Sequence, residues 1–178
     1  CEEILYHIDS YPDKQYYAIG FKNNDGGYVL RSSLTKKCTS SAMTTLSPEG
    51  VITDQVSGSK VLVFEGFMDF LSWLSNVQQD TPEYDCCILN SVSNIDKALP
   101  WITAHNNIAA FMDNDEAGRK TLQKIIENVP DDAGKVCVYD MAKLYEDYND
   151  LNEKLSDELS SKDEHSSINT HNHGDNTI

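Results

Sequence analysis

The stretch that decides the fold is Val61-Leu62-Val63-Phe64-Glu65-Gly66, four apolar residues followed by a carboxylate and a glycine. Three further apolar runs follow it, at residues 86–89, 108–112 and 136–139. Continuous apolar runs of this length are typical of strands buried on both faces, as in parallel sheets. Amphipathic helical patterns separate the runs, over residues 67–77, 94–104 and 118–129. The alternation predicts an α/β fold: an open, mostly parallel sheet flanked by helices.

Around this core, over residues 60–155, we expect a lobe and a tail. Residues 1–59 are predicted to form a small β-rich lobe, because Asn23-Asn24-Asp25-Gly26 between two alternating runs is a strong hairpin signal. A last helix with Leu151, Leu155 and Leu159 is expected to fade into a polar tail, residues 156–178, that is expected to be disordered. Within the second helical pattern, Pro100 is expected to interrupt the helix.

The composition limits what the chain can do. It has 178 residues with 29 Asp and Glu against 14 Lys and Arg, a net charge of −15. This balance argues against a stand-alone, non-specific binder of phosphate backbones, and this chain alone is expected to bind nucleic acid weakly. No apolar run approaches the ~20 residues of a membrane helix. The five cysteines form no C-x-x-C pair, and with no signal peptide they favour a cytoplasmic protein without its own zinc site.

Acidic residues follow three of the four predicted strands. Glu65 ends the first, Asp113 and Asp115 follow the third, and the acidic segment 146–150 comes after the fourth; Asn90 and Ser91 follow the second. Ligands of open α/β sheets bind beyond these carboxyl ends. A cluster of carboxylates needs compensating positive charge, and no Lys or Arg lies within two residues of these ends. Mg²⁺, with Mn²⁺ as a substitute, is the predicted compensation.

Several of these acids have a structural alternative. Asp115 precedes a helix, where Asp is a favoured N-cap, and Asp150 followed by Glu153 resembles a capping box. Asp69, one turn into the helix after Glu65, is expected on the surface rather than as a ligand. Glu65 has no obvious structural task, since it directly ends a buried strand.

Three segments together resemble the Toprim domain of bacterial primase-like proteins. Residues 61–69 are similar to its Glu-Gly motif in the E-G-x-M-D form, residues 111–120 to its D-x-D-x-A-G-x-x-A segment, and residues 145–152 to its third acidic motif, which usually reads Asp-Pro-Asp. The resemblance covers residues 60–155. The preceding lobe is similar to the segment before the Toprim core, most of all in the mobile-element primases of Bacteroides-type bacteria, which often carry a zinc finger upstream.

The resemblance implies a Rossmannoid Toprim core that performs Mg²⁺-dependent nucleotidyl transfer, as a DNA primase making short primers on single-stranded DNA. It implies that Glu65, Asp113 and Asp115 are catalytic and bind Mg²⁺, with Glu65 also a general acid or base. Asp147 and Asp150 are secondary metal positions, and the choice between them stays open because the third motif lacks its Pro. Zinc is expected only in an upstream domain.

The implied partners are a single-stranded DNA template, nucleoside triphosphates, and a helicase or another replication protein. Candidates for binding nucleotide or nucleic acid are Arg31, Lys36, Asn90, Ser91, Arg119 and Lys120. Arg119 and Lys120 also fit a solvated helix face.

Other functions use similar motifs. A Toprim nuclease or topoisomerase would cleave DNA, but strand passage needs a catalytic tyrosine and nothing singles one out among nine. A non-catalytic module that holds nucleic acid or protein would be marked by loss of Glu65 or of the D-x-D pair, and both are present. A haloacid-dehalogenase-like phosphatase expects Thr or Val after its D-x-D, where this chain has Glu116.

Overall fold

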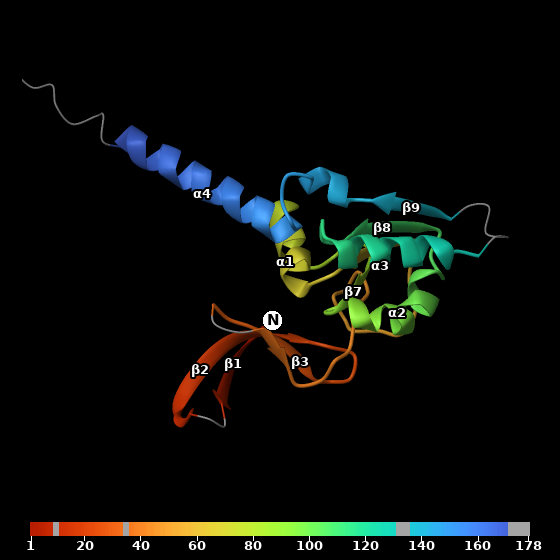
Figure 1. The fold of residues 1–178 in the computed structure, drawn as a ribbon, viewed down its shortest axis with the longest axis horizontal. Helices are drawn as coiled ribbons and strands as arrows, with labels where there is room; N and C mark the ends of the chain where they lie inside the picture. Colours follow the sequence, from red (N-terminus) through yellow and green to blue (C-terminus); the bar gives the residue numbers. More distant parts are fainter. Residues whose placement is uncertain (9–10, 34–35, 131–135, 171–178) are drawn as a thin grey trace, which may run out of the picture.

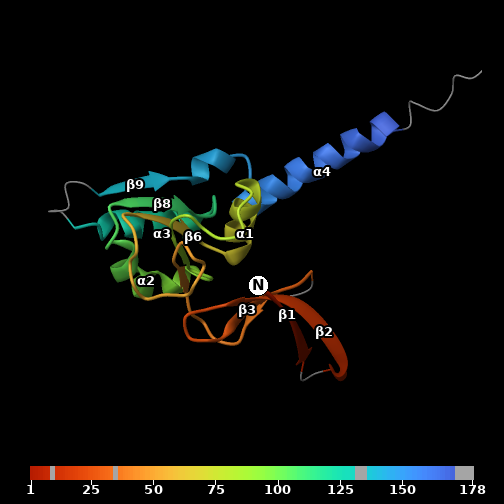
Figure 2. The ribbon, with the colours of Figure 1, turned by 180° about the vertical axis from the view of Figure 1, so that it is seen from behind.

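The computed structural model describes residues 1–8, 11–33, 36–130 and 136–170, and within these ranges the strands form two sheets (Figures 1 and 2). The N-terminal sheet is antiparallel with strand order β1-β2-β3-β4. Its strands are β1 (Glu2–Ile8), β2 (Tyr11–Lys22), β3 (Tyr28–Arg31) and β4 (Lys36–Cys38). The predicted hairpin at residues 23–26 is confirmed, since it joins β2 to β3.

The second sheet has the order β5-β7-β6-β8-β9. Its strands are β5 (Thr44–Leu46), β6 (Lys60–Phe64), β7 (Asp85–Ile88), β8 (Asn107–Phe111) and β9 (Cys137–Asp140). The last four are mutually parallel and correspond to the four apolar runs, so the predicted mostly parallel α/β fold is confirmed. The edge strand β5 pairs antiparallel with β7, although the expected boundary at residue 59 assigns it to the N-terminal lobe. Because β5 has only three residues, its sequence shows too little alternation of polar and apolar residues to predict which sheet it joins.

Helices cover both faces of this sheet. The helices are α1 (Phe67–Asn76), α2 (Ile95–Ile102), α3 (Glu116–Glu127) and α4 (Leu151–Thr170), with short 3-10 turns at Val92–Asn94 and Ala142–Tyr145. Alternation along β6 sends Leu62 and Phe64 to the face packed by α1 and α4, and Val61 and Val63 to the face packed by α2 and α3. No helix among the described residues is long and apolar enough to cross a membrane.

The N-terminal sheet packs on α1. Phe21 of β2 and Val29 of β3 belong to the same buried cluster as Phe67 and Phe70, and the rings of Phe21 and Phe67 stack with centroids 5.2 Å apart. This contact holds the end of β3 and the start of β4 beside the carboxyl ends of the parallel strands.

Two helix predictions are wrong. Helix α2 continues through Pro100 to Ile102, because the buried side chains of Trp101 and Ile102 hold its last turn in the core. The stretch from residue 156, expected to be disordered, is helical up to Thr170, and α4 projects from the body of the molecule (Figures 1 and 2). A capped start and i,i+4 pairs such as Lys154 with Glu158 extend a helix even without apolar residues. Residues 171–178 lie outside the described ranges.

A buried polar cluster closes the amino end of the parallel strands. Asp85, at the start of β7, is 1% exposed and accepts hydrogen bonds from the backbone N–H groups of Ser57 (2.7 Å) and Gly58 (3.0 Å) and from the Ser57 hydroxyl. His105 Nε2 lies 3.0 Å from Asp85 Oδ2. Burial acts to raise the pKa of Asp85, but the hydrogen bonds from Ser57, His105 and Gly58 outweigh it and hold that pKa below its usual range.

Candidate active site

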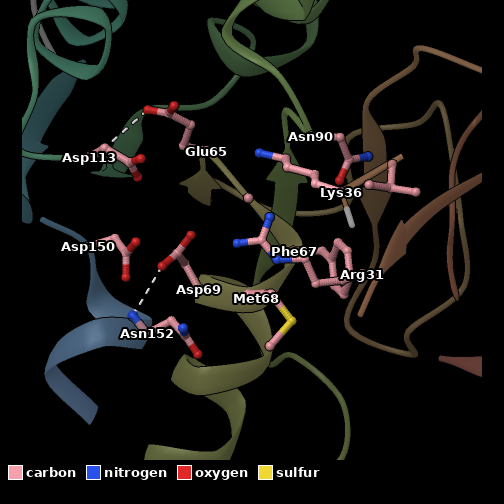
Figure 3. A pocket seen from close by; sticks show the side chains of 12 residues that line it. Arg31, Lys36, Glu65, Phe67, Met68, Asp69, Asn90, Asp113, Asp150 and Asn152 are labelled. Carbon is pink, nitrogen blue, oxygen red and sulfur yellow. Dashed lines mark hydrogen bonds between the residues drawn. The ribbon is translucent and has the colours of Figure 1, made fainter. Parts of the chain in front are cut away.

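Four carboxylates from four segments meet in one cavity of about 80 Å³ at the carboxyl end of the parallel strands (Figure 3). Glu65 follows β6, Asp113 follows β8, Asp69 lies in the first turn of α1, and Asp150 immediately precedes α4. The sequence placed Glu65 and Asp113 at this edge, and the structure brings both of them into the cavity.

Strand pairing sets Glu65 beside Asp113. Phe64 of β6 is in register with Phe111 of β8, and the Glu65 N–H donates to the Phe111 carbonyl oxygen at 3.2 Å. The Asp113 N–H in turn donates to Glu65 Oε2 at 3.3 Å. Burial, and then the negative charge of Asp113, raise the pKa of Glu65 to about 7. Glu65 can therefore both accept and release a proton near neutral pH.

Asp69 is buried in the cavity wall, so its expected place on the surface is wrong. Its side chain is 8% exposed, and its Oδ1 accepts a hydrogen bond from the Asn152 N–H at 3.1 Å. Burial and the charge of Asp150 raise the pKa of Asp69 to about 7. The E-G-x-M-D string already contains this residue, and its place in the motif was the available signal.

Asn114, the middle residue of the D-x-D segment, fixes the position of the third acidic motif. Its side-chain amide donates to the carbonyl oxygens of Tyr145 and Tyr148, both at 2.8 Å, and its N–H donates to the Asn149 carbonyl at 2.7 Å. These bonds hold the segment before Asp150 against the end of β8. Burial, and then the charge of Asp150, raise the pKa of Asp113 to about 6, while Lys36 acts in the opposite direction.

The structure separates Asp150 from Asp147. Asp150 lines the cavity and also caps α4, since its Oδ1 accepts the Glu153 N–H at 2.7 Å and Glu153 Oε2 accepts the Asn149 N–H at 2.8 Å. Asp147 is exposed and does not line the cavity. The capping box and the pocket position of Asp150 therefore coexist.

Asp115 caps α3 rather than lining the cavity. Its Oδ1 accepts the Gly118 N–H at 2.7 Å, and its side chain is exposed. Its charge still raises the pKa values of Glu65 and Asp113. A direct role of Asp115 as a metal ligand stays a prediction.

The donor set suits a hydrated divalent cation. No three Asp, Glu, His or Cys side chains in the described ranges are grouped closely enough to form a metal cage. Burial is the largest cause of the raised pKa values of Glu65, Asp69 and Asp113, and the charges of neighbouring carboxylates add to it. Mg²⁺ keeps several waters and takes only one or two carboxylates directly, so an open set of oxygen ligands fits it.

Basic and amide side chains form the wall opposite the carboxylates (Figure 3). Arg31 and Lys36 are register partners on β3 and β4 and reach into the cavity from the N-terminal sheet. Asn90, after β7, also lines it, and Ser91 lines an adjoining cavity of about 220 Å³.

Arg119 and Lys120 lie elsewhere, on the exposed face of α3. Arg119 donates to the Asn114 carbonyl oxygen at 3.0 Å, and Lys120 pairs with Glu116 at 2.6 Å. The structure does not bring these two residues to the cavity.

The chain belongs to the Toprim-like family, whose model matches residues 62–155. Residues 1–40 match a second family model, a domain of unknown function (DUF8464). No curated protein sequence matches the chain.

Two solved structures from bacteriophage T7 have a similar fold. The primase fragment of the T7 primase-helicase protein matches with a TM-score of 0.54 and 21% identity, over 91% of this chain and 63% of that fragment. A chain from the complex of the T7 lagging-strand DNA polymerase with two primase domains, an RNA/DNA hybrid and dTTP matches with a TM-score of 0.51 and 21% identity, over 91% of this chain and 78% of the other. The chain thus spans less than two thirds of the primase fragment. The predicted Toprim fold of primase-like proteins is confirmed, whereas the closer likeness to Bacteroides mobile elements stays a prediction.

Proposed function

We propose that this protein is a Mg²⁺-dependent nucleotidyltransferase, a DNA primase-like catalytic core that makes short primers on single-stranded DNA. The observation that carries the proposal is the cavity itself, where buried and partly buried carboxylates with raised pKa values face Arg31 and Lys36. Carboxylates suit the cations of a nucleotide complex, and basic side chains suit its phosphates. Residues 60–155 would form the catalytic core, with residues 1–59 as the lobe that supplies the basic wall.

Nucleotidyl transfer joins the 3′-hydroxyl oxygen of a primer to the α-phosphorus of a nucleoside triphosphate and releases pyrophosphate and a proton. Glu65, with a pKa of about 7, is suited to take that proton at neutral pH. Arg31 and Lys36 would bind the negative charge of the phosphates. When bound, Mg²⁺ would polarise the phosphate oxygens, and Asp113 and Asp150 would hold it, which leaves Glu65 free to accept the proton.

The other expected residues take supporting places in this proposal. Asp115 caps α3 through Oδ1 and does not line the cavity, so its contribution would come mainly from its charge. Asp69 would hold a water of the cation through its pocket-facing carboxylate. Single-stranded DNA and nucleoside triphosphates are the proposed substrates, and a helicase or other replication protein is the proposed partner.

The test compares Glu65→Gln with Glu83→Gln, the same change at an exposed residue outside the cavity. Each protein is incubated with single-stranded DNA, labelled nucleotides and Mg²⁺ or Mn²⁺, beside a plasmid-nicking assay and calorimetry with Mg²⁺. We expect metal-dependent oligonucleotide synthesis that falls about 100-fold or more in Glu65→Gln, the usual contribution of a general base, and is unchanged in Glu83→Gln. Nicking without synthesis would instead identify a DNA-cleaving enzyme. Absence of both activities and of Mg²⁺ binding would indicate a non-catalytic module.

A further inference from the structure

Asn90 holds a buried acceptor that the protein leaves unpaired. The residue is 7% exposed, and its Oδ1 has no hydrogen-bond partner among the residues that the structure describes. Gln79 Oε1 and Trp101 Nε1 share that property, but neither residue lines the carboxylate cavity or its neighbour. A buried polar atom without a partner costs about 1–3 kcal/mol, so this one calls for a ligand that donates a hydrogen bond.

The orientation of the Asn90 amide is fixed by its other atom. Nδ2 donates to the Ala42 carbonyl oxygen at 3.0 Å and to Thr44 Oγ1 at 3.1 Å. The Thr44 hydroxyl proton is already donated to the Lys22 carbonyl oxygen at 2.9 Å, so Thr44 can only accept from Asn90. Rotating the amide by half a turn would place Oδ1 against two acceptors. The orientation of the amide therefore leaves Oδ1 as a buried acceptor without a partner among the described residues, in a residue that lines both cavities.

Asn90 stands where two different cavities meet. On one side lies the charged cavity with the four carboxylates, Arg31 and Lys36. On the other side lies the cavity of about 220 Å³, whose wall holds no acidic residue and includes Lys36 and Lys37 besides polar side chains such as Ser91. The two cavities therefore differ in whether they hold carboxylates that suit a cation, and in a nucleoside triphosphate the ribose likewise separates the part that binds metal ions from the part that does not. The backbone of Asn90 is left-handed (φ 62°), a conformation that suits Asn better than most residues.

We propose that the cavity beyond Asn90 binds the nucleoside part of the incoming nucleotide, with Asn90 Oδ1 accepting a hydrogen bond from a ribose hydroxyl. This inference rests on the proposed function, because it takes a nucleoside triphosphate as the ligand. It assigns Asn90 the discrimination between nucleotides that carry this hydroxyl and those that lack it.

The test measures equilibrium binding of ATP, 2′-deoxy-ATP, 3′-deoxy-ATP and inorganic triphosphate, each with Mg²⁺, to the full chain. We expect one of the two deoxy analogues to bind up to about tenfold more weakly than ATP, the worth of one hydrogen bond. Asn90→Gly, which tolerates the left-handed backbone, should abolish that difference. Gln78→Gly is the matched control, since Gln78 also has a positive φ (56°) but lines neither cavity.

Equal binding of ATP and both analogues to the unaltered protein would overturn the inference, whether or not Asn90→Gly folds. Retained discrimination in a folded Asn90→Gly would also overturn it. If neither ATP nor inorganic triphosphate binds at all, the proposed function itself fails. Binding of inorganic triphosphate together with equal binding of the three nucleotides would leave the proposed function standing and refute only the role of Asn90.

Discussion

Gly118 offers a sharp test of how the fold positions Asp113. Within a helix, Ala is more favourable than Gly by about 1 kcal/mol, so local propensity alone predicts that Gly118→Ala stabilises the protein. The tertiary structure predicts the reverse. A Cβ at residue 118 would lie 2.1 Å from the Asp113 carbonyl oxygen and 2.9 Å from the backbone N and C atoms of Asp113. A carbon and a carbonyl oxygen rest about 3.3 Å apart, so α3 and the Asp113 backbone would have to separate by about 1 Å.

That displacement affects both stability and the site. Overpacking of this kind costs about 1–3 kcal/mol, enough to cancel or exceed the gain in propensity. A shift of about 1 Å in a positioned group can lower a rate by about 100-fold. We therefore expect Gly118→Ala to lower the free energy of unfolding in urea and to weaken both Mn²⁺ binding and primer synthesis.

The control for Gly118→Ala is Ala117→Gly, at the exposed neighbouring residue of the same helical turn. It should lower the free energy of unfolding by about 1 kcal/mol through propensity alone and leave Mn²⁺ affinity unchanged. A Gly118→Ala protein that is more stable than the parent and binds Mn²⁺ normally would refute the idea that this close approach positions Asp113.

Three further predictions test the remaining parts of the site and the fold. The folded state raises the pKa of Asp69 from 3.8 to about 7, so the folded protein holds an extra proton between these values and its stability falls as pH rises through this window. In metal-free buffer at pH 8, Asp69→Asn should therefore be more stable than the parent by about 1–3 kcal/mol in thermal denaturation. Near pH 4 the two proteins should be equally stable. The same pH dependence of stability in both proteins would contradict this prediction. Asn114→Ala should lower the free energy of unfolding by about 1–3 kcal/mol and weaken Mg²⁺ binding, because the carbonyl oxygens of Tyr145 and Tyr148 each lose a donor. Asn128→Ala, which removes one exposed bond at the opposite end of α3, should change neither. The pKa of Asp85 is lowered in the folded state, so its contribution to stability is present above about pH 4 and is lost as pH falls through the folded pKa. Asp85→Asn should flatten this acid limb of the denaturation profile, and an unchanged limb would show that other carboxyl groups cause it.

The architecture of the core could be predicted from the sequence, because the strands are buried on both faces and therefore form continuous apolar runs. Val61 and Val63 are fully buried, as a strand covered on both faces requires, and the same holds for Ile88 and Ile108 in the neighbouring strands. Runs of this kind have few alternatives once helical patterns separate them. The acidic residues that directly follow such strands could be placed at one edge by topology alone, and Glu65 and Asp113 are the examples.

Other parts of the site depend on contacts between distant segments. Asp69 is buried because Asn152, 83 residues further along the chain, donates to it from the start of α4. Asp147 lies outside the cavity because Asn114 forms hydrogen bonds with the backbone of the segment 145–149 and fixes its position. Hydrogen bonds to backbone atoms do not depend on the residue types of that segment, so they could not be predicted from its sequence. Strand β5 is too short for periodicity, and only its pairing with β7 assigns it to the larger sheet.

The pKa values of acidic residues are shifted in opposite directions at the two ends of the parallel strands. At the amino end, Asp85 receives hydrogen bonds from two backbone N–H groups, a hydroxyl and an imidazole, and its pKa is lowered. At the carboxyl end, Glu65 and Asp113 are partly buried against each other and their pKa values are raised. At neutral pH, an ionised carboxylate at the amino end therefore stabilises the folded state, whereas ionised carboxylates at the carboxyl end destabilise it. The fold thus provides hydrogen-bond donors for the carboxylate of Asp85 and fewer of them for the carboxylates of Glu65 and Asp113. Compensation of this cluster by a bound cation is what the proposed metal-dependent nucleotidyltransferase would require.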